Sequence, residues 1–152
     1  TIHAINILKQ KGYNIRFTLV GKVVNEVVYN EIQKLDFVKY IPPKQKDELL
    51  TIYQENDIYV MPSITETFGL VYPEAMSQGL PVIYSKGQGF DGQFEDGEVG
   101  FAVDCFDSYE IADRIINIVN NYSDISKRCI IYSDKFDWNK ISKTYEKSYN
   151  HR

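Results

Sequence analysis

The sequence lacks most of the features that mark metal-binding, disulfide-bonded or nucleic-acid-binding proteins. It holds two cysteines, Cys105 and Cys129, and neither stands in a CxxC or other ligand-like spacing. This excludes a disulfide framework and argues against a zinc site. The formal net charge is -4 and no run of basic residues occurs, so the positive face that nucleic-acid binding requires is missing. We therefore expect neither a metal nor a nucleic acid among the ligands.

Long apolar runs are also missing. No stretch approaches the ~18 apolar residues that a membrane span needs. Residues 1–11 have the spacing of a helix and no apolar signal core, so together with the few cysteines the sequence predicts a cytoplasmic protein. The chain has 152 residues, 43% of them hydrophobic, and no internal repeat or linker. We expect a single domain over residues 1–152 with its own core.

What the sequence does contain is a regular alternation of apolar runs and amphipathic stretches. Strands are predicted at residues 15–20, 37–41, 57–61, 80–84 and 101–103. Helices are predicted at residues 1–11, 24–35, 46–54, 108–120, 123–134 and 138–150, with one more through 73–76 that ends at Gly79. This alternation predicts an α/β fold, a Rossmann-like parallel sheet with helices on both faces. Ligands of such sheets bind beyond the carboxyl ends of the strands.

The segment with the most chemical content, residues 61–83, begins at such a strand end and continues into a helix. Gly69 has no Cβ and lets the backbone approach a ligand closely. The backbone N–H groups of Phe68, Gly69 and Leu70 are expected to be free at the start of the helix. Free N–H groups and the helix dipole together form an anion site, which suits a diphosphate.

Two glutamates flank this predicted anion site. Glu66 lies on the loop before it and Glu74 lies inside the helix. A carboxylate accepts two hydrogen bonds side by side, which suits the vicinal hydroxyls of a ribose or a hexose. The chain has ten glutamates, so a pair at the spacing of Glu66 and Glu74 can occur by chance. The sequence around the pair is therefore the stronger evidence for a binding site.

The run from Met61 to Ile83 resembles the signature of the large retaining glycosyltransferase family that includes sucrose and glycogen synthases and bacterial capsule enzymes. The family's Glu-x7-Glu motif matches Glu66 and Glu74. Further matches in the family's order are its second strand at 17–21, its late turn and strand at 96–103 and the start of its last helix at 136–138. The resemblance thus covers nearly the whole chain.

This resemblance implies the C-terminal, donor-binding domain of a two-domain GT-B enzyme. It implies that Glu74 binds the ribose of a UDP- or GDP-sugar and that Glu66, the catalytic candidate, binds the transferred sugar. The N–H groups of Phe68, Gly69 and Leu70 would hold sugar hydroxyls or the diphosphate. Transfer would proceed with retention, without a metal or cofactor, and with the departing phosphate as base.

The family pattern also contains parts that this sequence lacks. The N-terminal acceptor domain, the first strand of the C-terminal domain and an Arg…Lys pair for the diphosphate are absent, so the isolated chain is expected to bind donor weakly and not to catalyse. The first strand of the family lies between the strands predicted at 15–20 and 57–61. We therefore expect these two strands to pair directly or to pair through their edges with another chain.

Other candidate residues lie at the remaining strand ends. Gly21 matches the family's phosphate-side glycine, and Lys22 either reaches a phosphate or stays in solvent. Ile41 either covers the nucleobase or belongs to a plain turn before Pro42. Trp138 is predicted to be a packing anchor at the start of the last helix.

The stretch from Gly87 to Gly92 satisfies the GxGxxG pattern of dinucleotide sites. That fingerprint also requires a helix directly afterwards, and the residues after Gly92 favour turns instead. The loop is expected either to edge the sugar pocket, with Phe90 and Asp91 toward the acceptor, or simply to connect two elements.

Three rival functions remain open at this stage. A nucleotide-sugar epimerase can share this fold, a glycosidase can use two carboxylates, and a non-catalytic module can bind a nucleotide-sugar without transferring the sugar. For the whole enzyme, the resemblance indicates bacterial surface-polysaccharide synthesis and is compatible with peripheral membrane association.

Overall fold

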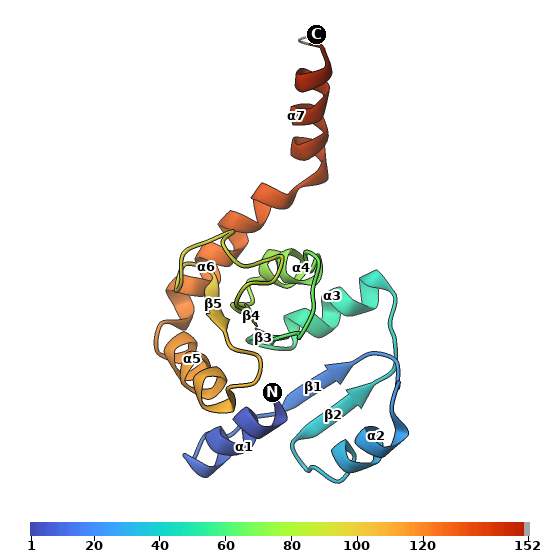
Figure 1. Ribbon diagram of the computed structural model, residues 1–152, viewed down its shortest axis with the longest axis vertical. Helices are drawn as coiled ribbons and strands as arrows, with labels where there is room; N and C mark the ends of the chain where they lie inside the picture. The colour runs from blue at the N-terminus through green and yellow to red at the C-terminus, as the bar shows by residue number, and fades with distance from the viewer. Residues whose placement is uncertain (151–152) are drawn as a thin grey trace.

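Parallel strand pairing dominates the computed structural model, which describes residues 1–150 except for the side chains at 144, 147, 148 and 150. Strand β1 (Phe17–Val20) pairs with β2 (Val38–Ile41) in one sheet. Strands β3 (Tyr59–Val60), β4 (Val82–Ser85) and β5 (Gly100–Val103) form a second sheet in that order. Both sheets are parallel throughout, as the alternation of apolar and amphipathic segments predicts (Figure 1).

Helices connect these strands in the expected order. They are α1 (Ile2–Gln10), α2 (Glu26–Ile32), α3 (Lys46–Gln54), α4 (Val71–Ser77), α5 (Ser108–Asn120), α6 (Tyr122–Ser133), the 3-10 helix η1 (Asp134–Phe136) and α7 (Trp138–Asn150). Helix α2 begins later than its prediction because Asn25 caps it: the Asn25 side chain accepts a hydrogen bond from the N–H of Val28 at 3.1 Å. None of the helices within residues 1–150 is both long and apolar enough to cross a membrane.

The predicted direct pairing of the strands at 15–20 and 57–61 is wrong. Within residues 1–150, β1 pairs with β2 alone and β3 with β4 alone. A side-chain contact joins β1 to the segment between α3 and β3, where the Thr18 hydroxyl donates to the Asn56 side chain at 3.0 Å. Edge pairing with another chain stays a prediction.

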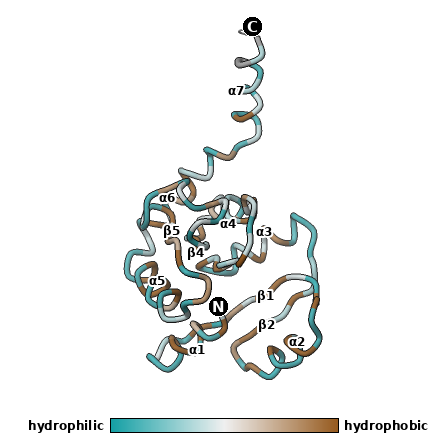
Figure 2. Tube along the Cα trace, in the orientation of Figure 1, coloured by the Kyte–Doolittle hydropathy of each residue, from teal (hydrophilic) through white to brown (hydrophobic). Residues whose placement is uncertain are grey.

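The core is centred on β4, whose four residues are all buried. Helix α1 packs against α5 and α4 against α6, and each pair contributes buried apolar side chains around this strand. Figure 2 shows apolar residues along the elements of the core and also on α2, whose Val27 is exposed. Burial on both faces explains why β4 has no alternation of polar and apolar residues.

A salt bridge ties the loops after β4 and β5 to α5. The Lys86 ammonium donates to Glu110 at 2.5 Å, and the N–H of Asp104 donates to the other Glu110 oxygen at 2.7 Å. The hydrogen bond from Lys86 is the main cause that lowers the pKa of Glu110 from its ordinary 4.5. These contacts stabilise the ionised carboxylate and hold the start of the glycine-rich loop.

This salt bridge predicts a pH dependence of stability. Because folding lowers the pKa of Glu110, its contribution is present above its ordinary pKa and is lost as the pH falls through the folded-state pKa. Between about pH 5 and pH 3, urea unfolding of Glu110→Gln should therefore lose stability less steeply than the wild type does. Lys86→Met should flatten the same limb. Equal slopes for all three proteins would contradict the prediction.

Candidate functional site

The loop between β3 and α4 carries the predicted anion site. Gly69 has a φ of +79°, a left-handed conformation, and a Cβ there would overlap the Tyr72 ring, with 2.6 Å to Cδ2. Only glycine avoids both costs. Among residues 1–150, nothing accepts a hydrogen bond from the backbone N–H of Phe68, Gly69 or Leu70. The donors that the sequence predicts to be free at the helix start are free.

Glu66 lies before these donors, half-buried, and its backbone is held on both sides. Its N–H donates to the Gln88 side chain at 2.8 Å, and its carbonyl accepts from the N–H of Gly89 at 3.2 Å. Its carboxylate accepts from the N–H of Thr67 at 2.9 Å. No other described residue donates to this carboxylate, so its remaining acceptor positions are open to a ligand.

Glu74 lies beyond the donors, in the first turn of α4, with about a third of its side chain exposed (32%). Lys46, the first residue of α3, places its ammonium 3.8 Å from the Glu74 carboxylate. Lys46 is not predictable from the sequence, because no local pattern shows that the start of α3 lies beside α4. A cation therefore stands beside the carboxylate that the resemblance assigns to the ribose.

Three tyrosines with neighbouring rings are affected by the charges of the two glutamates. The rings of Tyr53 and Tyr59 lie 5.8 Å apart, as do those of Tyr59 and Tyr72. Burial and then Glu74 raise the pKa of Tyr53 to about 12, and burial and then Glu66 raise the pKa of Tyr72 to about 12. Burial, the neighbouring tyrosines and both glutamates raise the pKa of Tyr59. The charges of both carboxylates thus act on the pKa of Tyr59, the middle of the three rings.

The other predicted residues lie at the end of the β1–β2 sheet. The structure brings Gly21 and Ile41 together, since the Gly21 N–H donates to the Ile41 carbonyl at 3.2 Å. The Tyr40 hydroxyl donates to the Gly21 carbonyl at 2.8 Å and fixes this end. Lys22 is exposed directly after it. These residues form a second group at a carboxyl sheet edge, as Glu66 and its neighbours do after β3.

The glycine-rich loop lies beside Glu66, but Phe90 differs from its prediction. Phe90 does not face an acceptor: it is 1% exposed, with its ring 4.8 Å from that of Tyr72. Asp91 is used within the loop, where its carboxylate accepts from the N–H of Gly87 at 2.7 Å. A turn follows the glycines, where the dinucleotide fingerprint needs a helix. The residue of this loop that bonds Glu66 through its side chain is Gln88. The GxGxxG pattern around it indicates a phosphate site and gives no sign of this contact.

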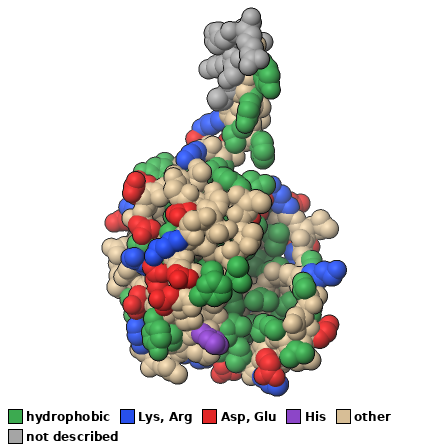
Figure 3. Space-filling view, viewed as in Figure 1, with side chains coloured by type: hydrophobic (Ala, Val, Ile, Leu, Met, Phe, Trp, Pro, Cys, Tyr) green, Lys and Arg blue, Asp and Glu red, His purple; other side chains and the backbone are tan. Residues whose placement is uncertain are grey.

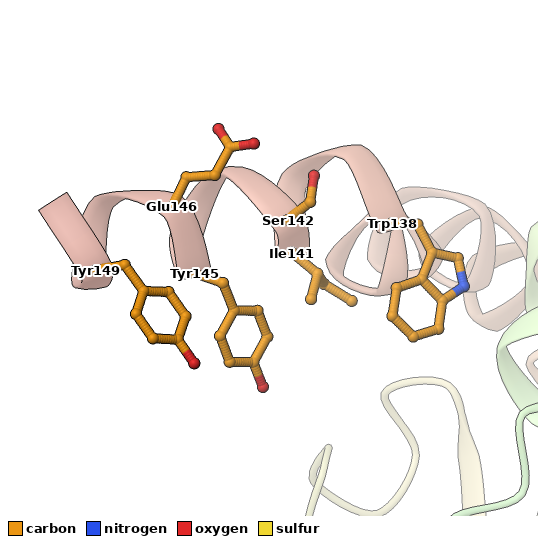
Figure 4. Close-up of a pocket in the computed structure, with 6 residues that line it drawn as sticks. All are labelled: Trp138, Ile141, Ser142, Tyr145, Glu146 and Tyr149. Atoms are coloured by element: carbon orange, nitrogen blue, oxygen red, sulfur yellow. The ribbon is translucent and has the colours of Figure 1, made fainter.

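A separate hollow runs along α7, outside this region. It is lined by Trp138, Ile141, Ser142, Tyr145, Glu146 and Tyr149. The large apolar side chains point to one side of the helix, while Ser142 and Glu146 point to the other (Figure 4). The prediction that Trp138 anchors packing is wrong, because α7 leaves the body of the domain and Trp138 is 70% exposed. All six residues belong to one helix, so no polar groups converge there from different elements.

Hydrophobic side chains also gather in the body of the domain. On the face seen in Figure 3, they fill a hollowed strip between the part that carries β1 and β2 and the part that carries the other sheet. The two parts thus meet along an apolar strip.

Topology and the β3–α4 loop together define the class of this domain: a Rossmann-like domain of the GT-B type, a fold used by glycosyltransferases. The profile of the family "Glycosyl transferases group 1" matches residues 1–136. The chain belongs to this family, as the run from Met61 to Ile83 predicts.

Relatives of known name are similar over most of the chain. It is 26% identical over 159 aligned residues to the D-inositol 3-phosphate glycosyltransferase of Paenarthrobacter aurescens, an alignment that covers 97% of this chain and 39% of that protein. It is 28% identical to the capsular polysaccharide biosynthesis glycosyltransferase CapM of Staphylococcus aureus, over 80% of this chain and 33% of CapM.

Solved structures support the same fold. The crystal structure of HepE from Anabaena in complex with UDP superposes with a TM-score of 0.84 at 22% identity. The superposition covers 100% of this chain and 45% of HepE. The chain therefore spans less than half the length of these relatives.

Proposed function

We propose that this chain is the donor-binding domain of a glycosyltransferase, which moves a sugar from a nucleotide-sugar to an acceptor with retention. One observation carries the proposal: in the segment between Glu66 and Glu74, the N–H groups of residues 68–70 are bonded to nothing among the described residues. The donors suit the diphosphate, and the carboxylates suit hydroxyl pairs on either side of it.

Each group then has a distinct role in the proposed reaction. The N–H groups of residues 68–70 stabilise negative charge on the departing diphosphate, which is where charge develops during transfer. Glu66 binds hydroxyls of the transferred sugar and Glu74 those of the ribose. Lys46, 3.8 Å from Glu74, offsets part of the repulsion between the carboxylates and the phosphates. The departing phosphate acts as the base, and no metal or cofactor takes part.

The donor proposed here is a UDP-sugar, with a GDP-sugar as the alternative. The support comes from fold neighbours, since HepE was solved with UDP and also with UDP-glucose. At the end of the other sheet, Gly21, Lys22 and Ile41 are the residues proposed to face the nucleotide. In this arrangement Ile41 covers the base.

The whole enzyme is proposed to have a second, N-terminal domain that binds the acceptor. The length of the relatives supports this proposal, since the chain covers 39% of the Paenarthrobacter enzyme and 33% of CapM. Among residues 1–150 the outer edges of β1 and β3 are unpaired, and a further strand of this same domain is proposed to pair with both. The named relative CapM supports a role in surface-polysaccharide synthesis. The proposed place of action is the cytoplasm, with peripheral membrane association of the whole enzyme.

Thermal unfolding with added nucleotides tests the donor site. At a hundredfold excess over Kd, a ligand specific to the folded state adds about 2.7 kcal/mol, or roughly 5–10 °C in a domain of this size. UDP or GDP should give this shift with the wild type, and Glu74→Gln should lose it. Glu55→Gln, which changes an exposed glutamate at the end of α3, should keep it.

Assays of the full-length protein with UDP-sugars separate the rival functions. A full-length protein that is stabilised by UDP-sugars but neither transfers nor hydrolyses them would be a non-catalytic binding module. Release of an epimerised nucleotide-sugar would indicate the epimerase. If no nucleotide stabilises the full-length protein, the assignment of the donor site is wrong.

A further inference from the structure

The glycine-rich loop at residues 86–93, here called the clamp loop, contacts the backbone of Glu66 directly. Gln88 accepts the Glu66 N–H through its side-chain oxygen at 2.8 Å. The next residue, Gly89, donates its N–H to the Glu66 carbonyl at 3.2 Å. Both polar groups of the Glu66 backbone are thus bonded to two successive residues of one loop.

The two loops touch without space for a side chain between them. A Cβ on Gly89 would overlap the carbonyl oxygen of Thr67 and lie 2.8 Å from the Cα of Phe68. Real Cβ atoms do not approach backbone this closely, so any other residue at position 89 must push the loops apart. The contact therefore fixes Glu66 and the start of the row of free N–H groups together.

The clamp loop is itself held at three places. Phe90 is buried, with its ring 4.8 Å from Tyr72 and 5.0 Å from Tyr84. The Asp91 carboxylate accepts from the N–H groups of Gly87 at 2.7 Å and Gly92 at 3.0 Å. At the start of the loop, Lys86 is paired with Glu110. Because the loop is anchored in this way, its hydrogen bonds fix the position of the Glu66 backbone.

The carboxylate of Glu66 depends on this support. Within the described chain its one hydrogen bond comes from the adjacent N–H of Thr67, so the direction of the side chain follows the local backbone. Misplacement of a reacting or binding group by about 1 Å can cost about a hundredfold in rate. The clamp loop therefore controls where the carboxylate points.

We propose that Gln88 is a positioning residue, which orients Glu66 toward the transferred sugar through the Glu66 backbone. This inference rests on the proposed function of Glu66 as the sugar-binding carboxylate. It adds a specific expectation: a change at Gln88 weakens the recognition of the sugar and leaves recognition of the nucleotide nearly unchanged, because Glu74 lies in a helix that Gln88 does not bond.

The test compares UDP with UDP-glucose as probes, by calorimetry on the full-length protein. Gln88→Met keeps the length of the side chain and removes its oxygen acceptor. We expect about tenfold weaker binding of UDP-glucose, a loss of the size that one hydrogen bond contributes, and less than about twofold change for UDP. Gln93→Met is the matched control: it makes the same change in the same loop, and the bond that it breaks is to Lys135. Both affinities should stay within about twofold there.

A second pair of variants tests the backbone contact. Gly89→Ala should weaken UDP-glucose binding by more than the roughly tenfold expected of Gln88→Met, because its Cβ displaces the backbone of Thr67 and Phe68. Gly87→Ala, at a left-handed position where a Cβ would meet nothing within 4 Å, should lower the melting temperature and leave the two affinities in their wild-type ratio. Unchanged UDP-glucose binding in Gln88→Met would overturn the proposal, as would an equal loss for both probes. A wild type that binds neither probe would instead overturn the proposed function.

Discussion

Gly100→Ala is expected to lower the free energy of unfolding by more than about 4 kcal/mol. Gly100 lies opposite Val82 in the β4–β5 ladder, and a Cβ there would overlap the Val82 carbonyl oxygen and lie 2.8 Å from the Val82 nitrogen. Both atoms belong to the backbone of the buried strand β4. Neither can move without separating the strands, so the ladder must open or the core must shift.

Differential scanning calorimetry measures this loss directly. For a chain of this size, each 1 kcal/mol corresponds to roughly 2–4 °C, so the melting temperature should fall by about 8–16 °C or more. Gly97→Ala is the matched control, because its φ is +87° and a Cβ there would meet only the Phe101 ring, at 3.7 Å. Its cost should stay near the ~1–2 kcal/mol of a left-handed alanine. Equal melting temperatures for the two variants would contradict the steric argument.

The parts of the fold that the sequence predicts are those with a local cause. Helix α3 begins and ends where the apolar spacing places it, at Lys46 and Gln54. Its start is stabilised by a capping interaction, in which Glu48 accepts the N–H of Gln45 at 3.2 Å. The unbonded donors at residues 68–70 were equally predictable, because they follow from one glycine and the start of one helix.

The parts that the sequence does not reveal depend on contacts between distant residues. Lys46 and Glu74 are 28 positions apart, and Glu66 and Gln88 are 22 apart. No period or spacing encodes such pairs. The separation of β1 from β3 belongs to the same class, since both strands are apolar enough to pair and only the arrangement of the whole domain keeps them apart.

Trp138 illustrates the opposite error. Its size predicts burial, yet the structure leaves it 70% exposed at the start of α7. A large aromatic residue at helical spacing indicates an apolar helix face, but the sequence of the helix does not show which element covers that face.

Glu66→Gln is expected to lower the kcat of the full-length enzyme by about 10²–10³-fold, the range found when one transition-state contact is removed. The substitution keeps the shape of the side chain and removes its charge. Because the Glu66 carboxylate is bonded only by Thr67 among the described residues, the proposed role leaves the transferred sugar as its main partner. Affinity for UDP should stay within about twofold, since UDP carries no sugar at that position.

Glu74→Gln provides the contrast for this measurement. This substitution should mainly weaken the affinity for the nucleotide, because Glu74 follows the free N–H groups in the chain and lies beside Lys46, away from Glu66 in the sequence. Steady-state kinetics with UDP-glucose and calorimetry with UDP would separate the two variants. If Glu66→Gln weakens UDP binding as much as Glu74→Gln does, the two carboxylates do not divide the donor between them, and the roles assigned to the sugar and ribose sides must be abandoned. If the two losses separate, one loop and one helix turn bind the two ends of the same donor.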